Sequence, residues 1–349
     1  MGHIKLIYNY VGDIKPDTLL SELESGVTFT EYSDHCDVVV PKVKVSNWHS
    51  YTVADNQFIL QVSDDIFSPE TIFNMILTNY IYNLDDFADL TLEDIDFSNS
   101  LYKDLVDSNH FILNETERPI FGTIIKPYHM SIEDRVEFVK HAFGCGFSIV
   151  KEDETHLVSR NQILEESKLI CQHVPTFCYY IPNITSHIDD DGFINQLGEI
   201  GIKAVLVNIC LVGFQAINKL KTSFSSLGIW GHRVGFSIIE KRISVRAFSK
   251  IATQAGVDFV HIGTPSTTDQ AQGKLYLINE MKRINPNVQA VFSKLSPETF
   301  NLLAQHDQSN SINIICGYMR EHGSGLVEWK RLEHFLVNLN HFNALEDSK

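Results

Sequence analysis

The chain has 349 residues, enough for a barrel of about 250 residues and a smaller second domain. It is 44% hydrophobic and 21% charged, as in ordinary globular proteins. It has no uncharged apolar run of about 18 residues, so a membrane protein is not expected. With 28 basic against 44 acidic residues the net charge is −16, which argues against a nucleic-acid partner.

The N-terminal sequence and the cysteines predict a cytoplasmic protein. The start, MGHIKLIYNY, lacks a basic region followed by an apolar signal core. The six cysteines are scattered and form no C-x-x-C pair, which indicates buried thiols rather than disulfides or a zinc site.

Residues 1–115 are predicted to form a small α+β domain of the ferredoxin-like type. Strand-like runs alternate with one helical pattern at residues 68–84, which begins with Ser68, Pro69 and Glu70, a favourable helix start. The acidic run LDDFADLTLEDIDF, residues 84–97, is interpreted as a solvated connector that approaches the linker to the next domain.

Residues 116–349 are predicted to form a (β/α)8 TIM barrel, because short apolar runs alternate with helix-length amphipathic segments. Ser131 is expected to cap a helix over 131–144, and Gly256 to close a second one that begins at Ser244. An open doubly wound sheet has the same pattern and remains an alternative. The eight expected strands are 120–126, 147–153, 176–182, 203–209, 228–234, 258–264, 288–294 and 312–318.

Polar residues collect at the C-terminal ends of these runs. In a barrel those ends converge on the face where active sites of this architecture lie, so a catalytic function is expected. The residues are Lys126, Lys151, Asp153, Glu154, Asn183, His232, Arg233, His261 and Ser293.

Lys151 stands directly before three acids in the stretch SIVKEDETH. Two carboxylates about 4 Å apart repel by roughly 4 kcal/mol at an effective dielectric of 20, so the cluster needs a compensating charge such as Mg²⁺. An ammonium has no lone pair for a metal. Lys151 therefore forms an ion pair, acts as a Schiff-base nucleophile, or reacts with CO₂ to give an anionic carbamate, and spacing alone does not choose among these.

The segments GTIIKP and IVKEDE, with their lysines 25 residues apart, resemble the large subunit of ribulose-bisphosphate carboxylase (RuBisCO) and the RuBisCO-like proteins. The resemblance extends over most of the chain. The segments LTLEDIDF, RPIFGTIIKP, GHRVGF, FVHIGTP and AVFSK follow in the order that the family has them.

This resemblance implies a set of site residues. Lys151 would be the lysine carbamylated by CO₂, with Asp153 and Glu154 completing the Mg²⁺ site, while Glu152 stands where the family usually has aspartate. Lys126 would move the proton during enolisation. Residues expected to contact substrate oxygens or phosphate are His232, Arg233, His261, Ser293 and Gly317. Elements lent to a neighbour's site would be Thr28 with Phe29 and Asn79, which implies a homodimer with shared active sites.

The chain also departs from the family pattern. The lysine that positions CO₂ follows the sixth strand closely in the carboxylase, whereas Lys274 falls within an expected helix and is interpreted as a solvated surface lysine, so CO₂ fixation is not expected. Leu295 and Cys316 replace glycines of the phosphate turns, and Tyr128 replaces a lysine. A single phosphate near Arg233 and His261 is therefore expected.

The sequence thus predicts a RuBisCO-like Mg²⁺-dependent enzyme that enolises a phosphorylated, sugar-derived ketone, as a tautomerase, isomerase or decarboxylase. The alternatives are a true carboxylase, a non-catalytic RuBisCO-like binding or regulatory protein, and a Schiff-base aldolase.

Overall fold

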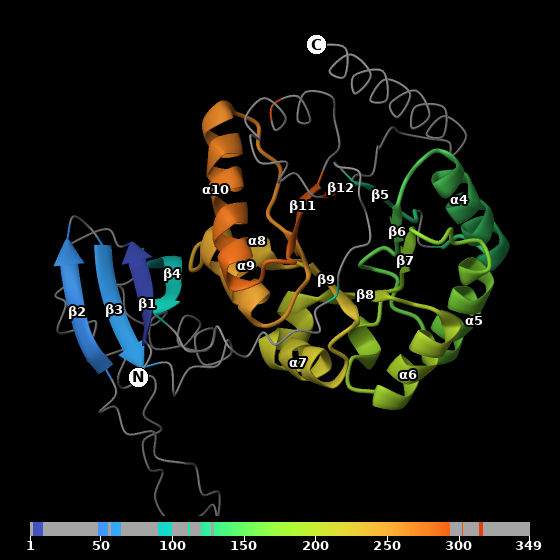
Figure 1. The fold of residues 1–349 in the computed structure, drawn as a ribbon, viewed down its shortest axis with the longest axis horizontal. Coiled ribbons are helices and arrows are strands. Elements are labelled where there is room, and N and C mark those ends of the chain that lie inside the picture. The colour runs from blue at the N-terminus through green and yellow to red at the C-terminus, as the bar shows by residue number, and fades with distance from the viewer. Residues whose placement is uncertain are drawn as a thin grey trace, which may run out of the picture. The chain divides into compact units, whose positions relative to one another are not determined.

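A computed structural model of the protein describes residues 3–9, 48–54, 57–63, 90–99, 111, 120–126, 129–293, 302 and 314–316 (Figure 1). The chain divides into two compact units. The first comprises Met1–Ser108, Gly213–Gln215 and Gly235–Ala255, and the second Asn109–Val212, Ala216–Val234 and Gly256–Lys349. The helix expected at 68–84 lies outside the described residues, and the boundary between residues 115 and 116 stays a prediction.

The first unit contains a four-stranded antiparallel sheet with the order β2-β3-β1-β4. Side chains alternate along β1, where Ile4, Leu6 and Tyr8 are buried, as expected for a sheet with one face in the core. In this order β1 and β3 are the two central strands, as in the sheet of a ferredoxin-like domain. The strands are β1 (His3–Asn9), β2 (Trp48–Ala54), β3 (Gln57–Ser63) and β4 (Thr91–Asn99).

The interpretation of the acidic run 84–97 as a solvated connector is wrong for the part that forms β4. Leu92 and Ile95 are fully buried, and Asp94 is nearly so. The Asp94 carboxylate lies 2.8 Å from Lys250 Nζ and 3.0 Å from Arg246 Nη2, so charge density here reflects ion pairing rather than solvation. The two cations come from α9 (Val245–Gln254), a helix that follows α8 (Phe236–Ile239).

The second unit contains a closed barrel of eight parallel strands in the order β7-β6-β5-β12-β11-β10-β9-β8. The amide of Leu206 donates to Pro182 O at 2.8 Å and that of Ile184 to Leu206 O at 3.0 Å, which joins β7 to β8. All eight predicted strands are confirmed, and closure excludes the open sheet. The strands are β5 (Ile120–Ile124), β6 (Ile149–Lys151), β7 (Tyr179–Ile181), β8 (Ala204–Asn208), β9 (Gly228–His232), β10 (Phe259–His261), β11 (Gln289–Ser293) and β12 (Ile314–Cys316).

Helices alternate with these strands, and Figure 1 shows α4, α5 and α6 outside the barrel beside β6, β7 and β8. The predicted caps are confirmed: Ser131 Oγ accepts from the amide of Asp134 at 3.1 Å, and Ser244 Oγ from that of Ala247 at 3.0 Å. The remaining helices are α4 (Ile132–Gly144), α5 (Arg160–Cys171), the short 3₁₀ helix η4 (Thr185–His187), α6 (Asp191–Ile200), α7 (Ile209–Ser223) and α10 (Thr268–Ile284).

Aromatic rings fill the barrel at the amino ends of its strands. Trp230 stacks on Phe259 with ring centroids 5.1 Å apart, and Phe111 lies 5.3 Å from Phe259. A Cβ at Gly228, the first residue of β9, would come within 2.9 Å of the Phe111 ring. Phe111 therefore occupies the amino end, which leaves the carboxyl ends of the strands for a site.

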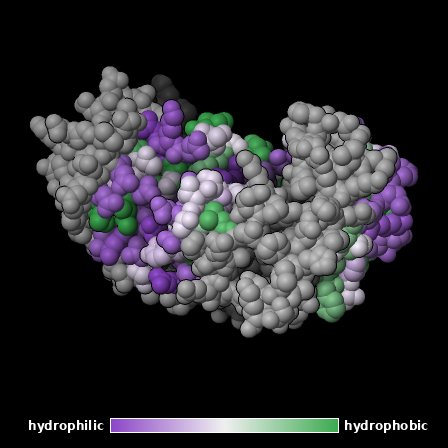
Figure 2. Space-filling model, turned by 90° about the horizontal axis from the view of Figure 1, so that it is seen from above, coloured by the Kyte–Doolittle hydropathy of each residue, from purple (hydrophilic) through white to green (hydrophobic). Residues whose placement is uncertain are grey.

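Figure 2 shows one face of the molecule, coloured by hydropathy. On the face shown in Figure 2, purple residues predominate and the green, apolar ones form small separate groups. Scattered apolar residues of this kind are normal on a protein surface. Among the described helices, none combines the length and the hydropathy that a bilayer crossing requires.

Candidate active site

Lys151, the last residue of β6, lies at the centre of a charged group inside the carboxyl end of the barrel. Its side chain is fully buried, and its Nζ donates to Glu152 O at 3.1 Å and lies 4.0 Å from Glu154 Oε2. Lys126, which follows β5, places its Nζ 2.7 Å from Asp153 Oδ2. The structure therefore brings together the two lysines and two of the three acids that the sequence singled out.

Asp153 is held as a carboxylate. Burial raises the pKa of its carboxyl group, but hydrogen bonds from Lys126 and Thr155 outweigh burial and bring the pKa below its usual value. Thr155 donates to Asp153 Oδ1 through its amide at 2.8 Å and its hydroxyl at 2.6 Å. One carboxylate oxygen is thus bound to the Thr155 turn, and the other faces the lysine.

Two buried asparagines hold the chain that carries the acids. Asn183 Nδ2 donates to the carbonyl oxygens of Asp153 at 3.1 Å and of Glu154 at 3.2 Å, and Asn208 Nδ2 donates to Glu154 O at 3.3 Å. Asn208 Oδ1 is buried and meets no hydrogen-bond partner among the described residues. Asn208 was not predicted as a site residue, although its position at the end of the run KAVLVNI was a usable signal.

His232 and His261, at the ends of β9 and β10, are neutral imidazoles. Burial, followed by the charge of Lys151, lowers the pKa of His232 to about 3, and burial lowers that of His261 well below its usual value. Trp230 Nε1 donates to His261 Nε2 at 2.7 Å, so Nδ1 carries the proton and donates to Ser293 Oγ at 3.2 Å. His232 Nε2 lies 3.7 Å from Glu154 Oε2.

The interpretation of Lys274 as a solvated surface lysine is wrong. The residue lies in a helix, α10, as predicted, but its side chain is largely buried and its Nζ donates to Ile262 O, directly after β10. Burial, followed by the charge of Arg233, lowers the pKa of Lys274 to about 8. Helical position alone does not reveal that a long side chain runs along the barrel to a strand end.

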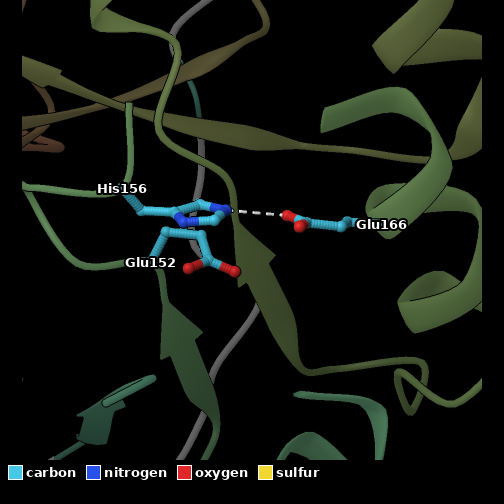
Figure 3. A group of neighbouring side chains, drawn as sticks. All are labelled: Glu152, His156 and Glu166. Carbon is cyan, nitrogen blue, oxygen red and sulfur yellow. Dashed lines mark hydrogen bonds and ion pairs between the residues drawn. The ribbon is translucent and has the colours of Figure 1, made fainter. Parts of the chain in front are cut away.

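Glu152 faces away from this group and belongs to a second buried cluster outside β6, shown in Figure 3 with His156 and Glu166. Arg135 Nη1 donates to Glu152 Oε2 at 2.6 Å and Nη2 to His156 Nδ1 at 3.0 Å. Because the guanidinium only donates, His156 Nε2 carries the ring proton and donates to Glu166 Oε2 at 2.9 Å.

The same three side chains are close enough for a metal, since their ligand atoms lie within 4.8 Å of one another. The Arg135 guanidinium already supplies the positive charge at this position, and Tyr180 OH donates to Glu152 Oε1 at 2.8 Å. These contacts therefore satisfy the group outside β6 without a metal ion. The two oxygens of Glu152 thus reach Arg135 and Tyr180 separately.

Gly317, Thr28, Phe29 and Asn79 lie outside the described residues, as do Tyr128 and Leu295. Their assignments, together with the shared-site homodimer that Thr28 and Asn79 imply, stay predictions.

No protein-family profile and no curated protein sequence matches this chain. Solved structures do match it. A Rubisco-like protein from Rhodopseudomonas palustris has a TM-score of 0.70 at 13% identity, over 97% of this chain and 97% of that one. Octameric Rubisco from Pyrococcus horikoshii has a TM-score of 0.67 at 17% identity, and the match covers 90% of this chain and 84% of that one. Dimeric Rubisco from Hyperthermus butylicus has a TM-score of 0.67 at 18% identity, and the match covers 90% of this chain and 85% of that one.

The chain has the RuBisCO fold. The resemblance inferred from the lysine-acid motif is thereby confirmed at the level of architecture, and the group around Lys151 lies at the carboxyl end of a RuBisCO-type barrel. Similarity at these identities establishes the fold, so the roles of individual residues are argued from their own geometry.

The cofactor implied by the RuBisCO fold is Mg²⁺ bound through a lysine carbamate, and the residues inside β6 fit it. Asp153 and Glu154 offer carboxylate oxygens, and the buried Asn208 Oδ1 is a further oxygen without a partner among the described residues. Hard oxygen donors of this kind suit Mg²⁺. Lys151 offers no lone pair as an ammonium, so its share in such a site depends on its conversion to a carbamate.

Proposed function

We propose that this chain is a RuBisCO-like enzyme that requires Mg²⁺ and enolises a phosphorylated, sugar-derived ketone. The products would be those of a tautomerase, isomerase or decarboxylase, because these reactions share one enolate intermediate. The observation that carries the proposal is the fully buried Lys151 beside Asp153 and Glu154, with Lys126 positioned 2.7 Å from the Asp153 carboxylate. Buried ionisable groups that converge at the carboxyl end of a barrel mark a candidate functional site.

Each residue of the site has a chemical task in this proposal. Mg²⁺, when bound through Asp153, Glu154 and the modified Lys151, would polarise the substrate carbonyl. Lys126, as a neutral amine, would accept the proton next to that carbonyl and return it to the product. His232 and His261 stay uncharged and therefore contact substrate oxygens as neutral hydrogen-bonding groups.

Proton exchange in D₂O tests the proposal directly. The wild-type protein, with Mg²⁺ and bicarbonate, is incubated with ketose monophosphates and with ribulose bisphosphate, and exchange of the α-proton is followed by NMR. We expect exchange with at least one monophosphate. The variant Lys151→Met should show none, while Lys168→Met, which removes an exposed lysine of α5, should match the wild type.

Two further measurements separate the alternatives at Lys151. A high-resolution electron-density map with Mg²⁺ and bicarbonate should show additional density on its Nζ. Borohydride with substrate should leave this lysine unreduced, whereas a Schiff-base aldolase would give a stable adduct. An unmodified lysine together with no exchange on any ketose would refute the enolase and favour a non-catalytic protein.

A true carboxylase is the second candidate, and the position of Lys274 favours it. The expectation against CO₂ fixation depended on a solvated Lys274, but its Nζ reaches the end of β10. Labelled CO₂ with ribulose bisphosphate decides between the two: incorporation into acid-stable product would establish carboxylation, and we expect none.

The assembly proposed with this function is a homodimer with shared sites, in which Thr28 and Asn79 complete the site of a neighbouring copy. The similar structure from Hyperthermus butylicus is described as dimeric. Sedimentation of the purified protein should therefore give the mass of a dimer.

A further inference from the structure

Trp230, His261 and Ser293 form a hydrogen-bonded chain along the inside of the barrel. In the register of the sheet Trp230 of β9 lies opposite Phe259 of β10, and His261 of β10 lies opposite Val291 of β11. Because every second residue of a barrel strand faces inward, the three polar side chains occupy successive inward positions toward the carboxyl ends. The chain therefore connects the aromatic rings at the amino end with the candidate site.

The indole fixes the direction of each hydrogen bond in this chain. Trp230 is fully buried, and an indole only donates, so His261 Nε2 accepts its hydrogen bond of 2.7 Å. The proton of the neutral imidazole is then on Nδ1, which donates to Ser293 Oγ at 3.2 Å. The His232 ring packs against the same imidazole, with centroids 5.0 Å apart. One tautomer of His261 is thus selected by its surroundings.

This tautomer leaves the hydroxyl proton of Ser293 available. The serine oxygen accepts from the imidazole, and its hydroxyl donates to no other group among the described residues. The side chain is only partly buried, at the carboxyl end of β11. A hydroxyl that accepts one hydrogen bond is polarised and donates more strongly to the next acceptor. The geometry therefore provides a preorganised donor for an oxygen atom in the site.

Loss of the indole N–H would reverse the chain. In Trp230→Phe the aromatic ring is kept, but Nε2 of His261 would be a buried acceptor without a donor, which costs free energy. An aromatic face can instead accept from an N–H group, so the imidazole proton would move to Nε2. His261 Nδ1 would then accept from the Ser293 hydroxyl. The serine proton would be used within the protein, and a bound molecule would lose a donor.

We propose that Trp230 is a positioning residue of the candidate active site, because its indole N–H fixes the tautomer of His261 and thereby directs the Ser293 hydroxyl proton to a substrate oxygen. This inference rests on the proposed function, since it gives Ser293 a contact with the substrate of that same site. It assigns a role to a side chain that touches no substrate. Packing on Phe259 alone requires the indole rings but not the N–H.

The tautomer of His261 can be measured without turnover. Protein labelled with ¹⁵N-histidine is studied at pH 7 by NMR, which correlates the ring nitrogens with the carbon-bound ring protons. The variant His261→Gln identifies the signals of this residue among the 15 histidines. Trp230→Phe removes the donor, and Phe259→Leu is the matched control because it reduces the same aromatic stack but keeps the indole N–H. Circular dichroism and thermal unfolding establish that each variant is folded.

We expect the His261 proton on Nδ1 in the wild type and in Phe259→Leu, and mainly on Nε2 in Trp230→Phe. A proton on Nε2 in the wild type would overturn the inference, as would an unchanged tautomer in Trp230→Phe. An equal change in Trp230→Phe and Phe259→Leu would also overturn it, since the imidazole would then respond to packing rather than to the hydrogen bond.

The rate of α-proton exchange tests the link between Trp230 and the substrate. We expect Ser293→Ala and Trp230→Phe each to lower kcat/KM about tenfold, the effect of one lost hydrogen bond. Because both changes remove the same donor, the double variant should be no slower than Ser293→Ala. Losses that multiply to about 100-fold would show that Trp230 acts by another route, and an undiminished rate in Trp230→Phe would show that it does not act on the substrate at all. Either result would overturn the inference.

The two measurements separate this inference from the proposed function. If no ketose shows proton exchange but the tautomer depends on Trp230, the enolase proposal fails, and the positioning of His261 by the indole stands. If exchange occurs but the tautomer does not depend on Trp230, the proposed function stands and the inference fails.

Discussion

Two buried charged clusters lie on opposite sides of the same short strand end, and they differ in how completely they are satisfied. Outside β6, Arg135, Glu152, His156 and Glu166 are joined by contacts of 2.6 to 3.0 Å. Inside β6, Lys126 Nζ lies 2.7 Å from Asp153 Oδ2, while Lys151 Nζ donates to Glu152 O at 3.1 Å and lies 4.0 Å from Glu154 Oε2. Asn208 Oδ1 and His232 Nδ1 in that inner cluster meet no hydrogen-bond partner among the described residues.

This difference distinguishes a structural network from a binding site. Buried polar groups in folded proteins are normally satisfied, so a fully paired cluster needs nothing more than the fold. A buried cluster with polar atoms that meet no partner among the described residues retains capacity for a ligand. Alternation along the strand explains how adjacent residues take opposite roles: Lys151 and Asp153 face inward, and Glu152 faces outward.

Removing a carboxylate from the inner cluster should have the largest effect, and it should fall on activity. Asp153→Asn keeps the shape of the side chain but loses the charge that faces Lys126. We expect proton exchange to fall by about 1,000-fold or more, since in the proposed mechanism both metal binding and the position of the base depend on this residue. Exchange rates by NMR and the unfolding midpoint in urea provide the comparison, and a collapse of stability with retained exchange per folded molecule would contradict it.

Breaking the outer cluster should have the next largest effect, on stability. Arg135→Met leaves Glu152 and Glu166 buried without their cation, and we expect the free energy of unfolding to fall by about 3–5 kcal/mol. Arg160→Met, which removes an exposed partner of Asp190, is the control and should leave stability unchanged. Urea denaturation measures both variants, and equal losses would show that burial of the network does not matter.

Shortening the outer acid tests why glutamate stands here. Glu152→Asp moves the carboxylate back by one methylene, so the contacts with Arg135 and Tyr180 weaken together, and we expect a loss of about 2 kcal/mol in the free energy of unfolding. The Mg²⁺ affinity of folded protein should be unchanged if the outer cluster only supports the strand. A large fall in that affinity would show that it also positions Lys151.

The smallest effect should be a gain in stability. Lys274→Met removes a cation whose pKa in the folded protein, about 8, is below the ordinary value of 10.5. The cost of holding that charge is therefore complete below about pH 8 and disappears as the pH rises past 10.5. Allowing for the lost contact with Ile262 O, we expect the variant to be more stable by about 1 kcal/mol at pH 7 and to lose this advantage at high pH. Thermal unfolding of both proteins across this pH range measures the difference in stability. A difference that stays the same at every pH would show that the charge of Lys274 is irrelevant.

The barrel could be predicted from sequence because each of its strands is a local apolar run. Helix starts are marked locally as well, by capping residues such as Ser131 and Ser244. The inner site residues Lys126, Lys151 and Asp153 could be found because strand ends converge in this architecture. The strand within the acidic run could not be predicted, since the cations that pair with Asp94 lie about 150 residues further along the chain.

The site residues that sequence reasoning missed share a physical cause. The burial of Lys274 depends on the path of its flexible four-carbon side chain, and helical periodicity in the sequence does not predict that path. Asn208 was overlooked because an uncharged amide carries no charge pattern, and the outer partners of Glu152 come from α4, α5 and β7, which only the folded barrel brings together.

The rings of Phe111, Phe259 and Trp230 fill the interior of the barrel on the amino side of the candidate site. Because these rings fill the amino end, a molecule that binds the candidate site enters and leaves past the carboxyl ends of the strands.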